Sequence, residues 1–218
     1  MKILLAVVLA AALAQHAGAD PGPMLRVEFS NPSLTPSNWS LVLRSDGSAH
    51  FHAERGSVPV ANTDRMEPAI VDRDVWLTAD FTARVFETVR HHNLLRDGRC
   101  ESHLKVAFQG WKKLSYSGPE GTGGCEFNYS KDKDIQGLGD ALVGVASTIV
   151  EGARVELLWQ YDPLGLDHAL EFIQQGARDG RLQQVCAIRP LLEKLESDPA
   201  VMERVRRRAQ QLLSEAGK

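Results

Sequence analysis

The sequence predicts an α+β protein, in which an antiparallel sheet packs with two helices and an all-helical C-terminal extension follows. Two observations predict this arrangement. Between residues 25 and 129, short segments place apolar side chains at every second position, which is the period of a strand with one buried face. From Asp134 onward, apolar side chains recur every three or four residues, which is the period of a helix.

The expected strands are separated by turn signals. Asp46-Gly47 favours a tight hairpin, because glycine accepts the positive φ of such a turn. Gln109-Gly110 is expected to turn a second pair of strands. Gly56–Arg73 is expected to be irregular and Gly118–Gly124 to be a loop. The expected strands are Leu25–Ser30, Trp39–Arg44, Ala49–Ala53, His103–Phe108, Trp111–Tyr116 and Cys125–Tyr129.

Helical periodicity marks further segments. Thr78 is a suitable N-cap for the first of them, and Asp80 in its first turn interacts favourably with the helix dipole. Pro190 is expected to kink or restart a later helix, and Pro199 fits the first turn of the last one. The expected helices are Leu77–Asn93, Asp134–Gly152, Arg154–Tyr161, Leu166–Arg178, Leu182–Glu196 and Ala200–Ser214.

A change of pattern at Asp162-Pro163 indicates a domain boundary. The chain then divides into a signal peptide, residues 1–19, an α+β sheet domain, residues 20–162, and a C-terminal helical region, residues 163–218. About 60 residues of helix bury too little apolar surface to be stable alone. The helical region is therefore expected to pack on the sheet domain as well as on itself.

The N-terminal segment has the three parts of a secretory signal peptide. Lys2 supplies a positive charge, Ile3–Ala14 is an unbroken apolar stretch, and Ala17-Gly18-Ala19 offers small residues before the cleavage point. The apolar stretch is shorter than the roughly 20 residues that span a bilayer. We therefore expect a mature chain that begins at Asp20, is periplasmic or secreted, and keeps no membrane anchor.

Charge and composition exclude one class of partner. The chain has 25 basic and 28 acidic side chains, a net charge of −3. Proteins that bind nucleic acid usually carry a basic patch or stripe, so no nucleic-acid partner is expected. An apolar content of 43% and a charged content of 24% are ordinary for a globular protein.

The three cysteines are informative because an exported chain meets oxidising conditions. Cys100 and Cys125 flank strand-like segments, whereas Cys186 lies in a helical pattern. We therefore expect a disulfide between Cys100 and Cys125, with Cys186 free and buried. Strand pairing about Gln109-Gly110 would bring the first two close enough to bond. The alternative is two free thiols in a reduced core.

Two histidines could begin a metal site. His50 and His52 stand two apart on an expected strand, so they project from one face. Nothing in the spacing selects a third ligand from His91, His92 and His103. The favoured interpretation is a solvent-exposed strand face.

A group of acidic residues follows. Asp72 and Asp74, with Asp64 and Glu67 nearby, could serve acid–base chemistry or bind calcium. The calcium-loop signature, with alternating acids, a central glycine and a closing glutamate, is absent from the sequence. A solvated, irregular segment is the favoured interpretation.

Signatures of catalysis are missing from the sequence. Gly118–Gly124 leads into an expected strand, whereas a phosphate-binding loop opens a helix. No Gly-x-Ser-x-Gly motif marks a nucleophilic serine. The apolar, helical setting of Cys186 indicates an inert thiol. We therefore expect no catalytic residue, no metal site and no cofactor.

A basic run near the C-terminus supplies candidate interaction residues. Arg204, Arg207 and Arg208 could bind an acidic partner. The alternative is a solvated, partly ion-paired helix face, because acidic residues such as Glu203 lie close by.

Two stretches resemble known families. Trp39–Val150 resembles a class of exported bacterial domains of unknown function, through Leu41–His52 and Phe108–Gly118. This resemblance implies the fold and export, and it implies no site residues because that class has no established activity. Ile188–Leu213 is similar to one helical pair of a HEAT-type repeat, in which an Asp-Pro turn precedes a helix with a stripe of Val, Arg and Ala.

These observations predict an exported, non-catalytic protein that acts through protein contacts or a bound ligand. Another envelope or secreted protein is the expected partner. The alternative is a small exported hydrolase with a dispersed active site, which a cleft with convergent His, Asp and Ser would favour. A flat apolar patch near Trp111 or Trp159 would favour protein contacts. Trp39, Trp111 and Tyr116 are candidates for exposed aromatic residues, with burial in the core as the alternative.

We predict that the chain is cleaved on export. N-terminal sequencing of the exported protein should read Asp20-Pro21-Gly22, because signal peptidase cuts after small residues. Recovery of the full-length chain from the cytoplasm alone would contradict this prediction.

Overall fold

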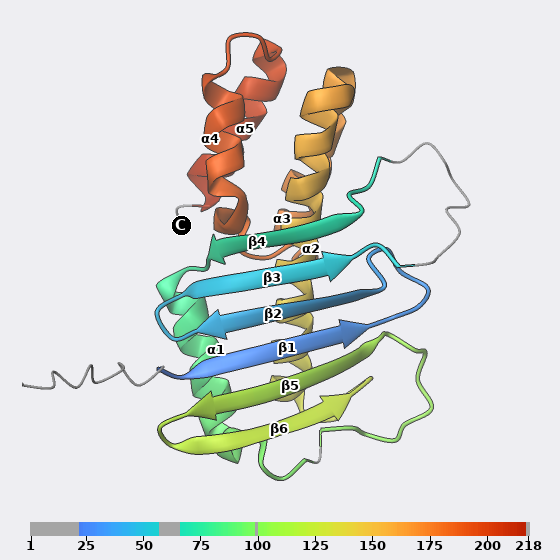
Figure 1. Cartoon of the computed structure of the whole chain (residues 1–218), viewed down its shortest axis with the longest axis vertical. Coiled ribbons are helices and arrows are strands. Elements are labelled where there is room, and N and C mark those ends of the chain that lie inside the picture. The colour runs from blue at the N-terminus through green and yellow to red at the C-terminus, as the bar shows by residue number, and fades with distance from the viewer. Residues whose placement is uncertain (1–21, 57–65, 99, 217–218) are drawn as a thin grey trace, which may run out of the picture.

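The structure, a computed structural model, describes residues 22–56, 66–98 and 100–216, so the expected signal peptide Met1–Ala19 lies outside the described residues. Within them, the chain forms a six-stranded antiparallel sheet and five α-helices, which confirms the predicted α+β fold class. The strands are β1 (Met24–Ser30), β2 (Asn38–Arg44), β3 (Ser48–Glu54), β4 (Ile70–Trp76), β5 (Trp111–Gly118) and β6 (Gly121–Phe127). Their order is β4-β3-β2-β1-β5-β6, with β4 and β6 at the edges (Figure 1).

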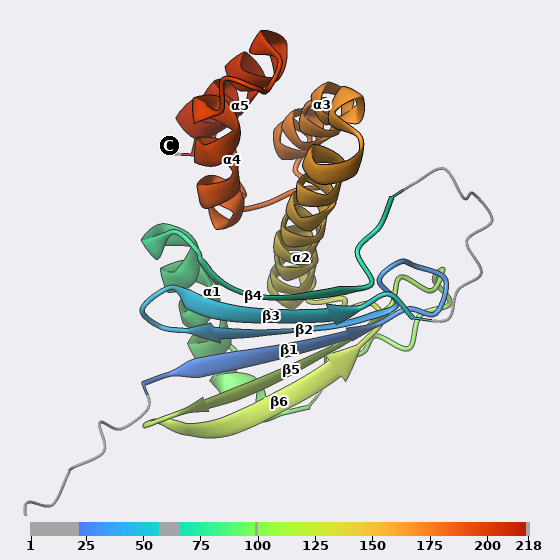
Figure 2. The same cartoon turned by 45° about the horizontal axis from the view of Figure 1, so that its top comes forward.

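Two helices cover one face of this sheet. They are α1 (Ala79–His91) and α2 (Lys133–Tyr161), and α2 runs across the strands and continues beyond β4 (Figure 1 and Figure 2). Three more helices stand beside that end of α2 (Figure 2). They are α3 (Leu166–Arg178), α4 (Arg189–Ser197) and α5 (Glu203–Ala216). Short 3-10 helices form at Asn93–Leu95, Pro163–Gly165 and Val185–Ile188.

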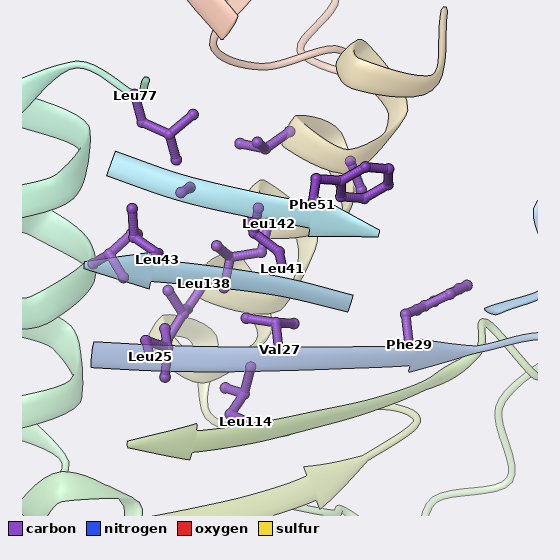
Figure 3. Close-up of a cluster of buried hydrophobic side chains, with 14 of the residues drawn as sticks. Leu25, Val27, Phe29, Leu41, Leu43, Phe51, Leu77, Leu114, Leu138 and Leu142 are labelled. Atoms are coloured by element: carbon purple, nitrogen blue, oxygen red, sulfur yellow. The ribbon is translucent and has the colours of Figure 1, made fainter. Parts of the chain in front are cut away.

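The main core fills the space between the sheet and these two helices. Successive side chains along a strand point to opposite faces, so the alternating apolar residues all face inward. Leu25 of β1, Leu41 of β2 and Leu114 of β5 lie in this layer with Leu142 of α2, and all four are fully buried (Figure 3). The opposite face of the sheet carries mostly polar side chains, together with exposed apolar residues such as Ile70 and Trp76 of β4 and Trp111 of β5.

The apolar core has two parts that share α2. The first contains the inner face of the sheet, α1, and α2 as far as Ala153. The second begins at Val155 of α2 and continues through the inner faces of α3, α4 and α5. α2 ends at Tyr161, beside the Asp162-Pro163 pair at which the sequence changes pattern.

Two strand predictions are wrong. His103–Phe108 forms no strand although its apolar residues alternate, because β5 already has β1 on one side and β6 on the other. Conversely, β4 forms inside the segment Gly56–Arg73 and just beyond it, where no strand was expected. Its buried positions alternate with exposed aspartates. β6 also begins early, because Gly121–Gly124 pairs with β5 instead of forming a loop.

The last two helices, α4 and α5, both begin later in the chain than expected. α4 begins at Arg189 with Pro190 in its first turn, which is the restart that the proline predicted. α5 begins at Glu203, later than expected, because Asp198 first closes a separate turn. In that turn the Val201 N–H donates to the Asp198 carbonyl at 3.1 Å.

α2 is continuous through Gly152, where a break was expected. This glycine serves close packing, because a Cβ added to it would collide with Ile188 Cγ2. A Cβ added to Gly144 would likewise lie 2.6 Å from Gln183 Cγ. Between the two glycines, Thr148 Oγ1 donates a hydrogen bond of 2.7 Å to the Gln183 carbonyl. Residues four apart share a helix face, so this stripe of small residues lets the chain before α4 cross α2 closely.

We predict opposite effects from two glycine substitutions in α2. Gly152→Ala should lower the free energy of unfolding by about 1–3 kcal/mol, because the new methyl group overlaps the β-branched side chain of Ile188. Gly137→Ala, the matched control, adds its methyl group to open space and should raise stability by up to about 1 kcal/mol. Urea unfolding followed by circular dichroism measures both, and equal effects would contradict this packing.

Candidate functional site

A cavity of about 350 Å³ lies between the sheet and α2. It lies at the end of β1 that carries Phe29, the end farther from α1 (Figure 3). The sheet forms its floor, α2 forms a wall, and the loop between β1 and β2 contributes to its rim. The described apolar residues that line it are Phe29, Leu34, Pro36, Trp39, Ala53, Pro68, Val71, Val143, Ala146, Val150, Phe172 and Leu182.

Aromatic rings that contact one another form the floor of the cavity. Phe29 and Trp39 lie opposite each other in the β1–β2 register, with ring centroids 5.1 Å apart and planes inclined by 12°. Trp39 also contacts Phe51, at 6.0 Å between centroids, and is only 7% exposed. Of the three aromatic residues considered as exposed, Trp39 and Tyr116 are buried and Trp111 is exposed.

Five charged side chains among the described residues also line the cavity: Arg55, Glu67, Glu151, Arg154 and Arg181. Arg154 Nη1 donates to Glu151 Oε2 at 3.0 Å, and these side chains are only 16% and 11% exposed. The Nε atom of Arg154 is buried and has no hydrogen-bond partner in the part of the chain that is described. Glu67, like Glu151, is engaged in further interactions.

The three arginines differ in how many of their guanidinium N–H groups have a partner. Arg181 contacts the Asp179 carboxylate at 2.8 Å and lies 5.3 Å from the centre of the Phe172 ring. Arg55 is half-buried, and its side chain makes no hydrogen bond or ion pair within residues 22–56, 66–98 and 100–216. Among the described lining residues, Arg55 therefore offers a guanidinium group without a side-chain partner, whereas the unpaired Nε of Arg154 lies buried behind the surface of the cavity.

The cavity offers little for hydrolysis. Its hydroxyl groups come from Thr35 and Ser147, and no histidine is among the described lining residues. Ser147 Oγ donates to the Val143 carbonyl at 2.9 Å, so its proton is used within α2. The described lining thus combines an apolar surface with guanidinium groups, without a His–Ser pair.

The histidine and aspartate candidates meet on the open face of the sheet. β3 pairs with β4 so that His50 lies opposite Asp74, and their side chains approach to 2.9 Å. His52 lies opposite Asp72, with Nδ1 2.7 Å from Oδ2. The hydrogen bond to Asp72, followed by the contact with Glu54, raises the pKa of His52 above its ordinary value. Asp72 also lies 3.8 Å from His50 Nε2, so it contacts both rings, and the histidines and carboxylates form one continuous row on the surface.

His92 belongs to a separate cluster between α1 and α2. Its Nδ1 lies 3.5 Å from Asp132 Oδ2 and its Nε2 lies 3.6 Å from Asp134 Oδ2. Ligating atoms of the three residues lie within 4.8 Å of one another. Asp132 is the N-cap of α2, however, and the positive end of a helix dipole stabilises carboxylates while opposing a cation. We interpret the cluster as a helix cap whose carboxylates contact the His92 ring at the end of α1 and so join the two helices.

The other candidates from these groups lie apart from both clusters. His91 ends α1, and His103 lies in the irregular segment before β5. Asp64 is outside the described residues, whereas Glu67 lines the cavity.

The predicted Cys100–Cys125 disulfide is present, with the two Cα atoms 5.9 Å apart, and Cys186 is free. The bond fastens the chain after α1 to β6, not through the strand pairing that was expected. Cys186 is half-buried, and burial raises the pKa of its thiol. A raised pKa favours the less reactive protonated form.

The three candidate interaction residues lie on α5. Arg208 and Arg204 face α3, with their Nε atoms 3.1 Å and 3.7 Å from the Asp167 carboxylate. Arg207 pairs with Glu203 on its own helix at 3.6 Å. None of the three lines the cavity, and their role in binding a partner stays a prediction.

Sequence reasoning misses the cavity because its lining comes from strands, helices and loops that are far apart in the chain. One local signal is present. Arg154 follows a long apolar stretch of helix, at a position where a charge is costly to bury. Such a residue is a candidate for a functional role.

Comparison with known proteins assigns no family. No family model matches the chain, and no curated protein matches it either. Within the described residues, no helix has both the length and the apolar character needed to cross a membrane.

We predict that the ion pairs on the open face hold a proton on His52. In an NMR titration, the pKa of His52 should lie above the ordinary value of about 6.5, and Asp72→Asn should lower it. A raised pKa in the folded state means that this stabilisation is complete below the unfolded value and is lost as the pH rises through the folded value. Asp74→Asn is the control, because Asp74 pairs with His50 instead. An equal response to both substitutions would contradict the assignment.

Proposed function

We propose that this chain is an exported, non-catalytic protein that binds a small molecule in the cavity between the sheet and α2. The cavity itself carries the proposal. Sites for small molecules are concave and mostly apolar, with a few convergent polar groups, and enclose about 300–1,000 Å³. A volume of about 350 Å³, an aromatic floor and a charged rim meet this description.

Export is supported by two independent features. Residues 1–19 have the pattern of a secretory signal peptide. The Cys100–Cys125 disulfide is of the kind that persists in oxidising compartments such as the periplasm or the extracellular space.

A second role, contact with another envelope or secreted protein, is favoured by exposed apolar residues in the segment that leads into β5 and at its first position. Leu104, Val106, Phe108 and Trp111 are 47%, 38%, 49% and 42% exposed. Phe108 and Trp111 contact each other edge to face, at 6.3 Å between ring centroids. Exposed apolar groups of this kind mark interaction surfaces. None of the four lines the cavity, so the two roles can be tested separately.

We predict that the neutral probe octan-1-ol enters the cavity. In an NMR titration, the indole N–H signal of Trp39 should shift with a dissociation constant of roughly 0.1–1 mM, as befits a ligand of nine non-hydrogen atoms. Val150→Phe should weaken binding by about tenfold or more, because the larger ring fills space beside the wall of α2.

The control is the same substitution on the other side of the sheet. Val42 lies on the open face, opposite His50, and lines no part of the cavity. Val42→Phe should leave octan-1-ol binding unchanged. Failure of the wild-type chain to bind, or equal weakening by both variants, would overturn the proposed function.

A further inference from the structure

We propose that the ligand of this cavity is an amphipathic anion, with an apolar body that lies on the aromatic floor and one negatively charged group at the rim. This inference rests on the proposed function and names the class of ligand. It follows from the apolar walls, the size of the cavity and the hydrogen-bonding state of its arginines.

The walls select the apolar body. Trp39 and Phe29 offer ring surface from the sheet, and Val143, Ala146 and Val150 face it from α2. The liquid volume per water molecule is about 30 Å³, so a cavity of about 350 Å³ has room for roughly a dozen non-hydrogen atoms. A short acyl chain or one aromatic ring with a short tail meets this limit.

The arginines select the charge. A guanidinium group has five N–H donors and does not lose its proton in proteins. At Arg154, Nη1 has the partner Glu151, whereas the buried Nε has none among the described residues. Arg55 brings a second guanidinium without a partner in the described chain. A carboxylate or phosphate can accept several such N–H groups at once.

The acidic residues at the cavity do not reverse this preference. Glu151 is bound to Arg154, and Glu67 is engaged in interactions of its own. Arg181 is held by Asp179. An entering cation would therefore have to displace existing contacts, whereas an anion meets the guanidinium group of Arg55, which has no side-chain partner among the described residues. An orientation follows, with the charged group beside Arg55 and Arg154 and the apolar body beside Trp39.

Three probes of one chain length test the inference: octanoate, octan-1-ol and octylammonium, each titrated into the purified full chain and followed by NMR at the Trp39 indole. Octanoate should bind roughly tenfold more tightly than octan-1-ol, because hydrogen bonds to charged groups are the stronger kind, and octylammonium should bind least. If octan-1-ol binds as tightly as octanoate, the preference for an anion is wrong, whereas the proposed binding of a small molecule in the cavity is supported. If none of the three probes binds, both the preference for an anion and the proposed function are wrong.

Substitutions locate the charge preference. Arg55→Gln and Arg154→Gln should each weaken octanoate binding severalfold and leave octan-1-ol binding within twofold of wild type. Arg44→Gln is the matched control, because Arg44 is exposed at the far end of β2 and lines no part of the cavity. Thermal unfolding checks each variant, and Arg55→Gln decides alone if Arg154→Gln unfolds on losing its contact with Glu151. An octanoate preference that survives Arg55→Gln undiminished would overturn the inference.

Discussion

The architecture depends on one geometric constraint: α2 is longer than the sheet is wide. Its 29 residues span about 43 Å at 1.5 Å per residue. Six strands about 4.8 Å apart place the axes of the edge strands only about 24 Å apart. The helix crosses the strands, so its C-terminal turns project beyond β4 (Figure 1). Val155 and Leu158 on those turns need another apolar surface, which α3, α4 and α5 supply.

The same helix has to serve three neighbours at once. Residues such as Leu142 and Ile149 face the sheet, and the small residues Gly144, Thr148 and Gly152 accept the crossing chain before α4. A third stripe, which includes Val150 and Arg154, lines the cavity. A helix that is occupied all round shows no single apolar stripe, so its middle departs from the simple amphipathic pattern. The cavity exists where the third stripe carries small or medium side chains.

Local patterns predict the parts of this fold that depend on near neighbours. The Asp46-Gly47 hairpin, the helix capped by Thr78 and the Cys100–Cys125 disulfide all follow from short stretches of sequence. The alternation in residues 103–108 fails as a predictor because a strand also needs a free neighbour, and β5 has none to offer. β4 is missed for the converse reason. Its exposed aspartates look irregular until β3 places a histidine opposite each of them.

The glycine in the middle of α2 shows a further limit of the local pattern. Gly152 looks like a helix end in the sequence, yet its role is to admit Ile188 from a distant segment. The cavity is harder still to predict, since no stretch of the chain contains more than a part of its lining. The sequence does show one residue whose burial is unfavourable. Arg154 is charged and follows an apolar stretch of helix, where burying a charge costs free energy.

Arg154 links the stability of the fold to the proposed ligand. Its side chain is 16% exposed, and each buried N–H group of a guanidinium needs an acceptor. Glu151 supplies one, and a buried donor left without a partner, as Nε is within the described residues, costs about 1–3 kcal/mol. An apolar residue at this position would avoid that cost but would give the rim nothing with which to hold an anion. An anion beside the Arg154 guanidinium group offsets the cost of burying its positive charge, and it does so in the folded state alone, so binding it stabilises the folded chain. The Arg154 guanidinium group thus lowers the stability of the protein without ligand and would also favour a negatively charged ligand.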